Sequence, residues 1–358
     1  MTPTIESFTI TRFSYPRDRT IGDSQVRSDW QHIGALELHA SNGRTGLGFF
    51  LSLFVPLPSV VELERLFRET TVPHLIGQNS FALVNQVTRP RGGNQQSNMF
   101  AEAINQALWD INAQTLDLPL YRLLGGTCER VRAYASPLDF HLSDEAFCAL
   151  LQRGQEMGFT AYKIKVGHPD LAWDVARLQL ARATVGSSAI LMADANEAWT
   201  PKEAIRRLHA FRDAGITLYW IEDPCLRDDF TGLREIRQAV PFTHVNSGEY
   251  LDLHGKQQLM AQGGADILNI HGHFSDGLRA GWLAAEYGLP VSLGNTMLEV
   301  GIHLAAALPE TNWIEYSFLN FNHLVAEPIQ FIDGYAVAPD RPGHGLVLSE
   351  QARRELAS

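Results

Sequence analysis

The sequence predicts an α/β fold, a (β/α)8-type TIM barrel preceded by an N-terminal α+β domain. Three observations support this prediction: the hydrophobic periodicity changes near residue 130, eight short apolar runs alternate with helical stretches after it, and no glycine-rich phosphate loop is present. The 358 residues suffice for two domains. We expect an α+β domain over 1–128 and the barrel over 129–329, with the tail, about 330–358, packing back on the first domain.

The N-terminal domain combines strand-like and helical segments. Alternating apolar residues predict strands over 7–15 and 33–41, separated by a polar interval over 16–29. Apolar residues at helical spacing predict helices over 59–77 and 99–116. Strands followed by helices are typical of an α+β arrangement.

The barrel is predicted by eight apolar runs. They begin at Val131, Ala161, Ala189, Leu218, Thr243, Ala265, Pro290 and Trp313. Strands alternating with helices in about 200 residues form parallel βαβ units, which close most naturally into a barrel. A doubly wound open sheet is the competing arrangement, but it normally begins with a glycine-rich turn.

Composition and charge limit the classes of partner. The chain has 29 basic and 40 acidic residues, a formal charge of −11, which argues against nucleic acid or an anionic membrane because both need a basic face. No apolar stretch approaches the roughly 20 residues of a membrane span, no signal sequence is evident, and the three cysteines show no CxxC spacing. We therefore expect a cytoplasmic protein. An anionic small-molecule substrate stays compatible with this charge, because a few buried cations decide the field inside a site.

Three acidic residues, Asp194, Glu222 and Glu249, end consecutive predicted barrel strands. The carboxyl ends of barrel strands face the active site, so the three side chains should converge. Converging carboxylates repel one another unless a cation is present, and oxygen ligands with open positions suit Mg²⁺. Any one of these acids alone is better interpreted as a helix cap or a loop residue. Three acids at the ends of consecutive strands, taken together, predict a Mg²⁺ site.

Two lysines, Lys163 and Lys165, lie two residues apart on the second predicted strand, so their side chains point the same way. Burial and the like charge of a neighbour both lower a lysine pKa toward neutrality, which would make one of them a general base. A solvated lysine face on an edge strand is the alternative. The apolar neighbours Ile164 and Val166 disfavour it.

The sixth, seventh and eighth predicted strands end in His271, Asn295 and Glu315. His271 would stand across the barrel from the second strand, so that a lysine and a histidine flank the metal as an acid/base pair. His273 is an equal rival by composition. A dication that holds a substrate carboxylate, together with a nearby base, is what abstraction of the proton α to that carboxylate requires.

Several motifs resemble a known family. ALWDINAQTLDLPLYRLLGG (107–126), KIKVG, ADAN, IEDP, GE and TMLE resemble the enolase superfamily, in particular the mandelate racemase and muconate lactonizing enzyme family. The resemblance spans essentially the whole chain. It implies a capping domain over the mouth of a modified (β/α)7β barrel, a Mg²⁺ cofactor, a small carboxylate substrate and a homo-oligomer.

The resemblance also implies roles for individual residues. Lys165 resembles the base and Lys163 its activating neighbour near the substrate carboxylate. Glu315 is similar to the acid that hydrogen-bonds the substrate carboxylate in the racemase. The implied Mg²⁺ ligands are Asp194, Glu222 and Glu249.

The segments 16–29 and 46–54 match the specificity loops of the family. We therefore expect substrate contacts from Arg17 and Phe50 in these segments, in addition to Asn295 at the barrel rim. Charged loop residues such as Arg17 are, however, more often solvated than bound to a ligand.

The sequence departs from the family at the second catalytic group. His271, in NIHGH, stands where muconate-type enzymes have a second lysine, and SLGNTMLE lacks the strand-seven histidine of racemase-type dehydratases. We favour dehydration of an acid sugar, with His271 protonating the departing hydroxide. The apolar FFLSLF segment leaves open a racemase, epimerase or cycloisomerase acting on a hydroxy or amino acid. A barrel that only binds a carboxylate is the alternative of another class.

Overall fold

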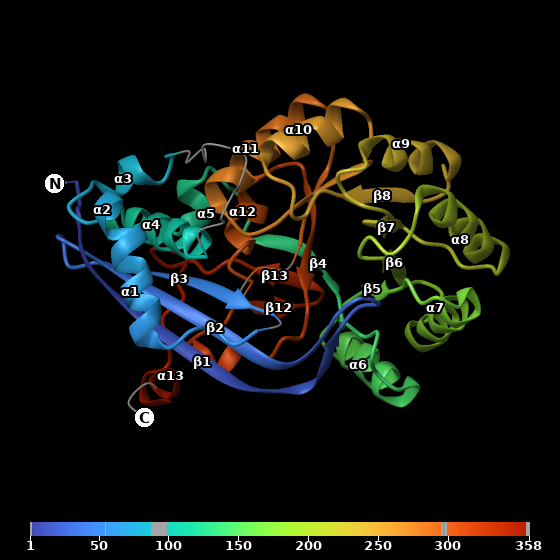
Figure 1. Ribbon diagram of the computed structural model, residues 1–358, viewed down its shortest axis with the longest axis horizontal. Helices are drawn as coiled ribbons and strands as arrows, with labels where there is room; N and C mark the ends of the chain where they lie inside the picture. Colours follow the sequence, from blue (N-terminus) through green and yellow to red (C-terminus); the bar gives the residue numbers. More distant parts are fainter. Residues whose placement is uncertain (1, 54, 87–98, 295, 297–298, 356–358) are drawn as a thin grey trace.

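Two sheets organise the computed structural model, which describes all residues except 1, 54, 87–98, 295, 297–298 and 356–358. The first sheet is antiparallel, with the order β1 (Ile5–Gly22), β2 (Arg27–Ala40) and β3 (Thr45–Ser52). The second is closed, because β11 pairs with β4 as well as with β10. The first sheet and its helices lie on the left of Figure 1, beside the barrel.

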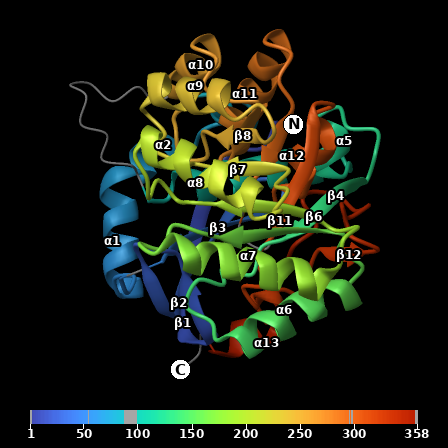
Figure 2. The ribbon, with the colours of Figure 1, turned by 90° about the vertical axis from the view of Figure 1, so that its right-hand side faces the viewer.

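The closed sheet confirms the predicted barrel. Its eight parallel strands, within the described residues, are β4 (Arg130–Ala135), β5 (Ala161–Lys165), β6 (Ile190–Asp194), β7 (Trp220–Glu222), β8 (His244–Ser247), β9 (Ile267–Ile270), β10 (Val291–Leu293) and β11 (Thr311–Tyr316). The connecting helices are α6 (Asp144–Glu156), α7 (Leu171–Val185), α8 (Pro201–Asp213), α9 (Phe230–Ala239), α10 (Leu253–Ala261), α11 (Phe274–Glu286) and α12 (Ile302–Ala307). Figure 2 shows α6 to α9 outside the strands. Seven helices joining eight strands give the (β/α)7β variant.

The barrel interior is divided into an apolar and a polar layer. Inward-facing side chains near the amino-terminal ends of the strands form an apolar cluster, which excludes water from that half. Two residues further along each strand the inward face becomes polar, because alternate residues share a face. The members of the apolar cluster are Tyr134, Ala161, Met192, Trp220, Ile267 and Trp313.

Within the described residues, five helices follow the first sheet along the chain: α1 (Val60–Thr70), α2 (Val72–Leu75), α3 (Ser80–Leu83), α4 (Ala101–Thr115) and α5 (Leu120–Leu123). Helices α1, α2 and α4 confirm the two predicted helical regions, although the first is divided at Thr71, where α2 begins with a proline in its first turn. Helix α4 packs closely on β3. A Cβ at Gly48 would lie 1.9 Å from the Ala103 carbonyl oxygen, so only glycine permits this approach.

The structure corrects the expectation that segments 16–29 and 46–54 are loops. Strand β1 continues to Gly22 and β2 begins at Arg27, so the connection is a tight turn in which Asp23 Oδ1 accepts hydrogen bonds from the Gln25 and Val26 amides. Pro16 is tolerated because β1 lies at the edge of its sheet. Residues 46–52 of the second segment belong to β3, Leu53 follows the strand, and Phe54 lies outside the described residues.

The C-terminal segment contacts both halves of the molecule. After the 3-10 helix η2 (Asn322–Leu324), the hairpin β12 (Gln330–Ile332) and β13 (Tyr335–Val337) pairs with β4, so this part of the tail joins the barrel and not the first sheet. Helix α13 (Glu350–Glu355) lies below the first sheet in Figure 1. There Arg353 Nη2 donates to Glu37 Oε1 at 2.8 Å.

The described residues include no helix with the length and apolar character that a bilayer crossing needs.

Glu299 provides a test of the packing beyond β10. Its side chain is buried, its backbone has a φ of 54°, and burial raises the pKa of its carboxyl to about 8. The unfolded chain therefore releases a proton at lower pH than the folded chain, and stability falls as pH rises from about 4.5 to about 8. Each pKa unit corresponds to about 1.4 kcal/mol.

We expect Glu299→Gln to remove this loss. Urea unfolding at pH 5, 7 and 9 should give a variant that gains several kcal/mol over the wild type between pH 5 and pH 9. Glu235→Gln, at an exposed position, is the control. If the stabilities of Glu299→Gln and the wild type changed in parallel with pH, the raised pKa of the Glu299 carboxyl would be contradicted.

Candidate active site

The strand ends bring the predicted acids and lysines together. Lys163 Nζ lies 2.9 Å from Glu222 Oε1, 3.3 Å from Asp194 Oδ2 and 3.2 Å from Glu315 Oε1. Lys165 Nζ donates to Asp194 Oδ2 at 2.6 Å. All five side chains are buried, so the two ammonium groups and three carboxylates interact with little solvent screening.

This environment corrects the expected direction of the lysine pKa values. Burial lowers the pKa of Lys163, but the charges of Glu222 and Glu315 outweigh it, and the pKa stands well above its ordinary value. Burial also lowers the pKa of Lys165, and Asp194 reverses the shift. From the sequence, burial and the like charge of the neighbouring lysine were expected to lower each pKa. The attraction of the paired carboxylates raises the lysine pKa values by more than burial and the neighbouring lysine lower them.

Negative charge is in excess at these strand ends. Glu249, the third predicted metal ligand, is also buried and has no lysine within ion-pair distance among the described residues. With Asp194, Glu222 and Glu315 it makes four carboxylates against two ammonium groups. Burial raises the pKa values of Glu222 and Glu249, and Lys163 offsets this only in part. A dication would balance the two uncompensated charges.

The donor set fits a hard dication. No three histidine, cysteine or carboxylate side chains in the described part of the chain stand ready around a metal position, and Lys163 Nζ lies among the carboxylates instead. The excess of two negative charges and the all-oxygen donor set are nevertheless what Mg²⁺ requires. Asp194, Glu222 and Glu249 are the residues that would hold it.

His271 follows β9 directly, on the other side of the barrel mouth. Its Nδ1 lies 3.8 Å from Glu249 Oε1, and its ring contacts Tyr250 edge-on with centroids 5.2 Å apart. This nitrogen is buried and has no hydrogen-bond partner among the described residues. His273 differs, because its side chain caps α11 by accepting from the Asp276 amide at 3.3 Å. The structure thus gives His273 a local role and places His271 beside Glu249.

Sequence reasoning missed two asparagines. Asn196 Oδ1 accepts from Lys165 Nζ at 2.8 Å, and its place in the ADAN motif was the available signal. Asn269 shares the inward face of β9 with His271. Its amide is fully buried, and neither polar atom has a partner in the described residues. Nothing in the local sequence marks Asn269, because its surroundings come from other strands.

A cavity of about 120 Å³ lies over the lysines, between the barrel and the β1–β2 hairpin. Cavities of about 710 and 550 Å³ also occur at the amino-terminal ends of the strands, away from these groups, where barrel enzymes do not carry out their chemistry. The smaller cavity is lined by Ile21, Gly22, Asp23, Val26, Ser28, Leu53, Leu138, Lys163, Lys165, Asp194, Asn196, Glu249, Tyr250, Glu315 and Leu319.

Arg17 and Phe50, the substrate contacts predicted from the N-terminal domain, do not line this cavity. Arg17 does not line the cavity but lies behind Ser28, to whose Oγ its Nε donates at 3.2 Å. The expectation for Phe50 is wrong: its buried ring packs against Phe100 in the core between the first sheet and its helices, in space left by Gly34. Asn295 lies outside the described residues.

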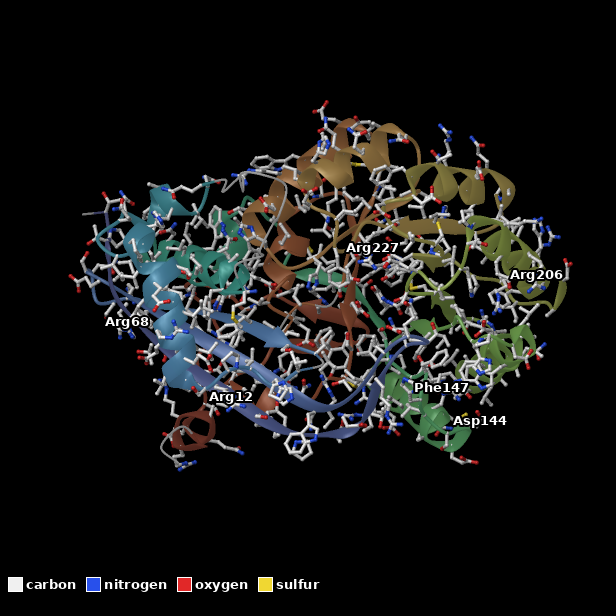
Figure 3. The ribbon with its side chains drawn as sticks, viewed as in Figure 1. Arg12, Arg68, Asp144, Phe147, Arg206 and Arg227 are labelled. Atoms are coloured by element: carbon white, nitrogen blue, oxygen red, sulfur yellow. The ribbon has the colours of Figure 1, made fainter. Side chains whose placement is uncertain are left out.

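Arg227 reinforces the site from behind. It pairs with Asp223 Oδ2 at 3.1 Å and Glu197 Oε1 at 2.9 Å, and its guanidinium lies over the Tyr250 ring. Asp223 also accepts from Ser247 Oγ at 2.6 Å, which links β7 to β8. Figure 3 shows Arg227 near the centre of the molecule, whereas Arg206 lies on the outer helix α8. These contacts hold together the carboxyl-terminal ends of β6, β7 and β8 and the backbone segments after them, which carry the candidate metal ligands.

Two family models match the chain. Enolase C-terminal domain-like matches residues 146–352, and Mandelate racemase / muconate lactonizing enzyme, N-terminal domain, matches residues 24–125.

Individual proteins are similar over much of the length. A 3,6-anhydro-alpha-L-galactonate cycloisomerase of Streptomyces coelicolor is 34% identical over 75% of this chain and 74% of its own. A crystal structure from Mesorhizobium loti, provisionally described as a mandelate racemase, is 54% identical with a TM-score of 0.95 and covers 99% of this chain and 94% of its own. L-talarate/galactarate dehydratase of Salmonella typhimurium, liganded with Mg and L-lyxarohydroxamate, is 27% identical with a TM-score of 0.85 and covers 99% and 93%.

The charge cluster predicts a large stability effect of Lys163. In Lys163→Met three buried carboxylates lose their shared ammonium, and breaking a buried ion pair from one side costs about 3–5 kcal/mol. Urea unfolding in EDTA should show a loss of this order at pH 8. The loss should be smaller at pH 5, where the carboxylates can take up protons. Lys202→Met, at an exposed position of α8, is the control. Equal stabilities of the two variants would contradict the claim that Lys163 stabilises the buried carboxylates.

Proposed function

Because this chain belongs to the mandelate racemase / muconate lactonizing enzyme family of the enolase superfamily, we propose that it removes the proton α to the carboxylate of a sugar acid and dehydrates it. It is an enzyme of the lyase or isomerase type, with Mg²⁺ as its cofactor. Asp194, Glu222 and Glu249 would hold Mg²⁺, which supplies positive charge against the charge that develops on the substrate carboxylate.

The observation that carries the proposal is the placement of Lys165 and His271. Lys165 ends β5 and His271 follows β9, and these strands are four places apart in the closed ring of eight within the described residues. They are therefore opposite each other. A group held between them meets a proton acceptor on one face and a proton donor on the other, as general acid–base catalysis requires.

The remaining polar groups take defined parts in the proposal. Lys165 would remove the α proton once Mg²⁺ neutralises Asp194, the carboxylate that raises its pKa, and Asn196, at 2.8 Å from its Nζ, orients it. Lys163 binds the substrate carboxylate, and Glu315, 3.2 Å from Lys163 Nζ, orients that ammonium group. Both lysines line the cavity that would receive the substrate.

Dehydration is favoured by the polar groups on the His271 side. The buried Asn269 amide and His271 Nδ1 lack partners in the described residues, and such groups cost about 1–3 kcal/mol each unless satisfied. A hydroxyl of the substrate or a water oxygen would satisfy them. His271 then protonates the departing hydroxide. The named relatives that act on sugar acids support this class of substrate.

Racemization, epimerization or cycloisomerization is the second candidate. Ile21, Val26 and Leu53 form an apolar wall of the cavity on the cap side, which suits an apolar substituent better than a row of hydroxyls. The same lysine and histidine would then remove and return protons on opposite faces. A barrel that only binds carboxylates would do neither.

Solvent exchange separates these possibilities. Sugar acids, including galactarate, and N-acyl amino acids are incubated with the enzyme and Mg²⁺ in D₂O, and α-deuterium and products are followed by NMR. We expect α-deuterium with at least one acid and loss of β-hydroxyl from a sugar acid. Lys165→Ala should reduce both by about 10²–10⁴-fold. Exchange without elimination favours the second candidate, and no exchange with any acid favours simple binding.

The two histidines provide a matched comparison. His271→Ala should abolish turnover while leaving the fold and Mg²⁺ binding intact. His273→Ala should keep turnover and lose only part of the stability of α11, because it removes a helix cap worth about 1 kcal/mol. Rates, circular dichroism and Mg²⁺ titrations of both variants check this. Near-normal turnover of His271→Ala would shift the second acid/base role to His273 or leave Lys165 alone.

A further inference from the structure

A buried lysine holds the segment that carries Glu249. Lys256 lies on the inner side of α10 and is only 5% exposed. Its ammonium donates to the carbonyl oxygens of Gly248 at 2.6 Å and Glu249 at 3.2 Å, and to that of Leu251. These carbonyls belong to the short connection between β8 and α10.

The arrangement uses the full donor capacity of the ammonium group. A lysine has three N–H donors, and each finds a carbonyl here. Burying a charge without such partners would cost far more than an ordinary hydrogen bond contributes. Because hydrogen bonds from a charged donor are roughly twice as strong as neutral ones, Lys256 restrains the peptide planes on both sides of Glu249.

Restraint of these peptide planes sets the direction of the Glu249 side chain. Gly248, just before it, has a φ of 112°, a conformation that other residues rarely adopt and that the neighbouring structure must maintain. The carboxylate of Glu249 is buried, has no lysine partner in the described residues, and is hydrogen-bonded to the side chain of Tyr250 in the same segment, so its position depends on the backbone that carries both residues.

We infer that Lys256 is a positioning residue for the metal site: it orders the 248–251 segment so that Glu249 presents its carboxylate to Mg²⁺. This inference rests on the proposed function, in which Glu249 is a Mg²⁺ ligand. Groups behind a metal ligand typically change metal affinity by 10–100-fold when they are removed. Lys256 carries no ligand atom, and nothing in its sequence surroundings assigns it to the site.

The chain offers a matched control in Arg182. Its Nη1 donates to the carbonyl oxygens of Gly186 at 2.9 Å, Ser187 at 3.4 Å and Ala189 at 2.6 Å, immediately before β6. This is also a cation joined to three carbonyls of one connection. It lies at the amino-terminal end of the barrel strands, away from the carboxylates. Arg182→Met therefore removes a similar anchor without touching the metal site.

The test is Mg²⁺ titration by isothermal calorimetry of the wild type, Lys256→Met and Arg182→Met, with thermal unfolding of each in EDTA. We expect Lys256→Met to raise the Mg²⁺ Kd by 10–100-fold and Arg182→Met to leave it within threefold, while both variants lose stability. A Lys256→Met protein that folds and binds Mg²⁺ within threefold of the wild type overturns the inference. An equal loss of affinity in Arg182→Met also overturns it.

Failure of the proposed function gives a different result, because the wild type itself would then bind no Mg²⁺. If Lys256→Met does not fold, Lys256→Gln takes its place, since its amide can still donate to part of the carbonyl cluster. The same threefold boundary decides the outcome for that variant.

Discussion

Excess negative charge at the carboxyl ends of the barrel strands is the constraint on which the rest of the structure depends. Four carboxylates and two ammonium groups are buried there, in a region where charges cannot be solvated. Such a cluster is tolerable only if each group has a partner and the remaining charge is balanced. Lys163 and Lys165 pair with Asp194, Glu222 and Glu315, whereas Glu249 has no lysine partner in the described residues, and a dication would balance the charge that remains.

The N-terminal domain completes this site by covering it. Arg19 joins the β1–β2 hairpin to the barrel by donating to the carbonyl oxygens of Phe318 at 2.9 Å and Pro137 at 3.1 Å. Gln31 adds a bond to the Leu319 carbonyl at 3.1 Å. The end of the hairpin is thereby held over the lysines. The long strands that replace the expected loops make this contact, because a paired hairpin keeps its direction where an unpaired loop would not.

Much of the fold and of the candidate site could be predicted from local patterns. Each barrel strand is a short apolar run, and the residue at its carboxyl end can be read directly, so Asp194, Glu222 and Lys165 were assigned correctly to one rim. Phe50 shows the limit. It lies on a strand with apolar residues on both faces, and the choice between core and cavity depended on the ring of Phe100 and the space at Gly34.

The sequence by itself determined the order of strands and helices, the barrel, and the chemical types at the strand ends, because these depend on periodicity and neighbours along the chain. Only the tertiary structure decided the ion pairs of the lysines, the separate environments of His271 and His273, and the anchoring of the Glu249 segment by Lys256. Each of these depends on groups from different strands or elements. Their mutual distances, and hence the strengths of their opposing electrostatic interactions, are set only when the barrel closes.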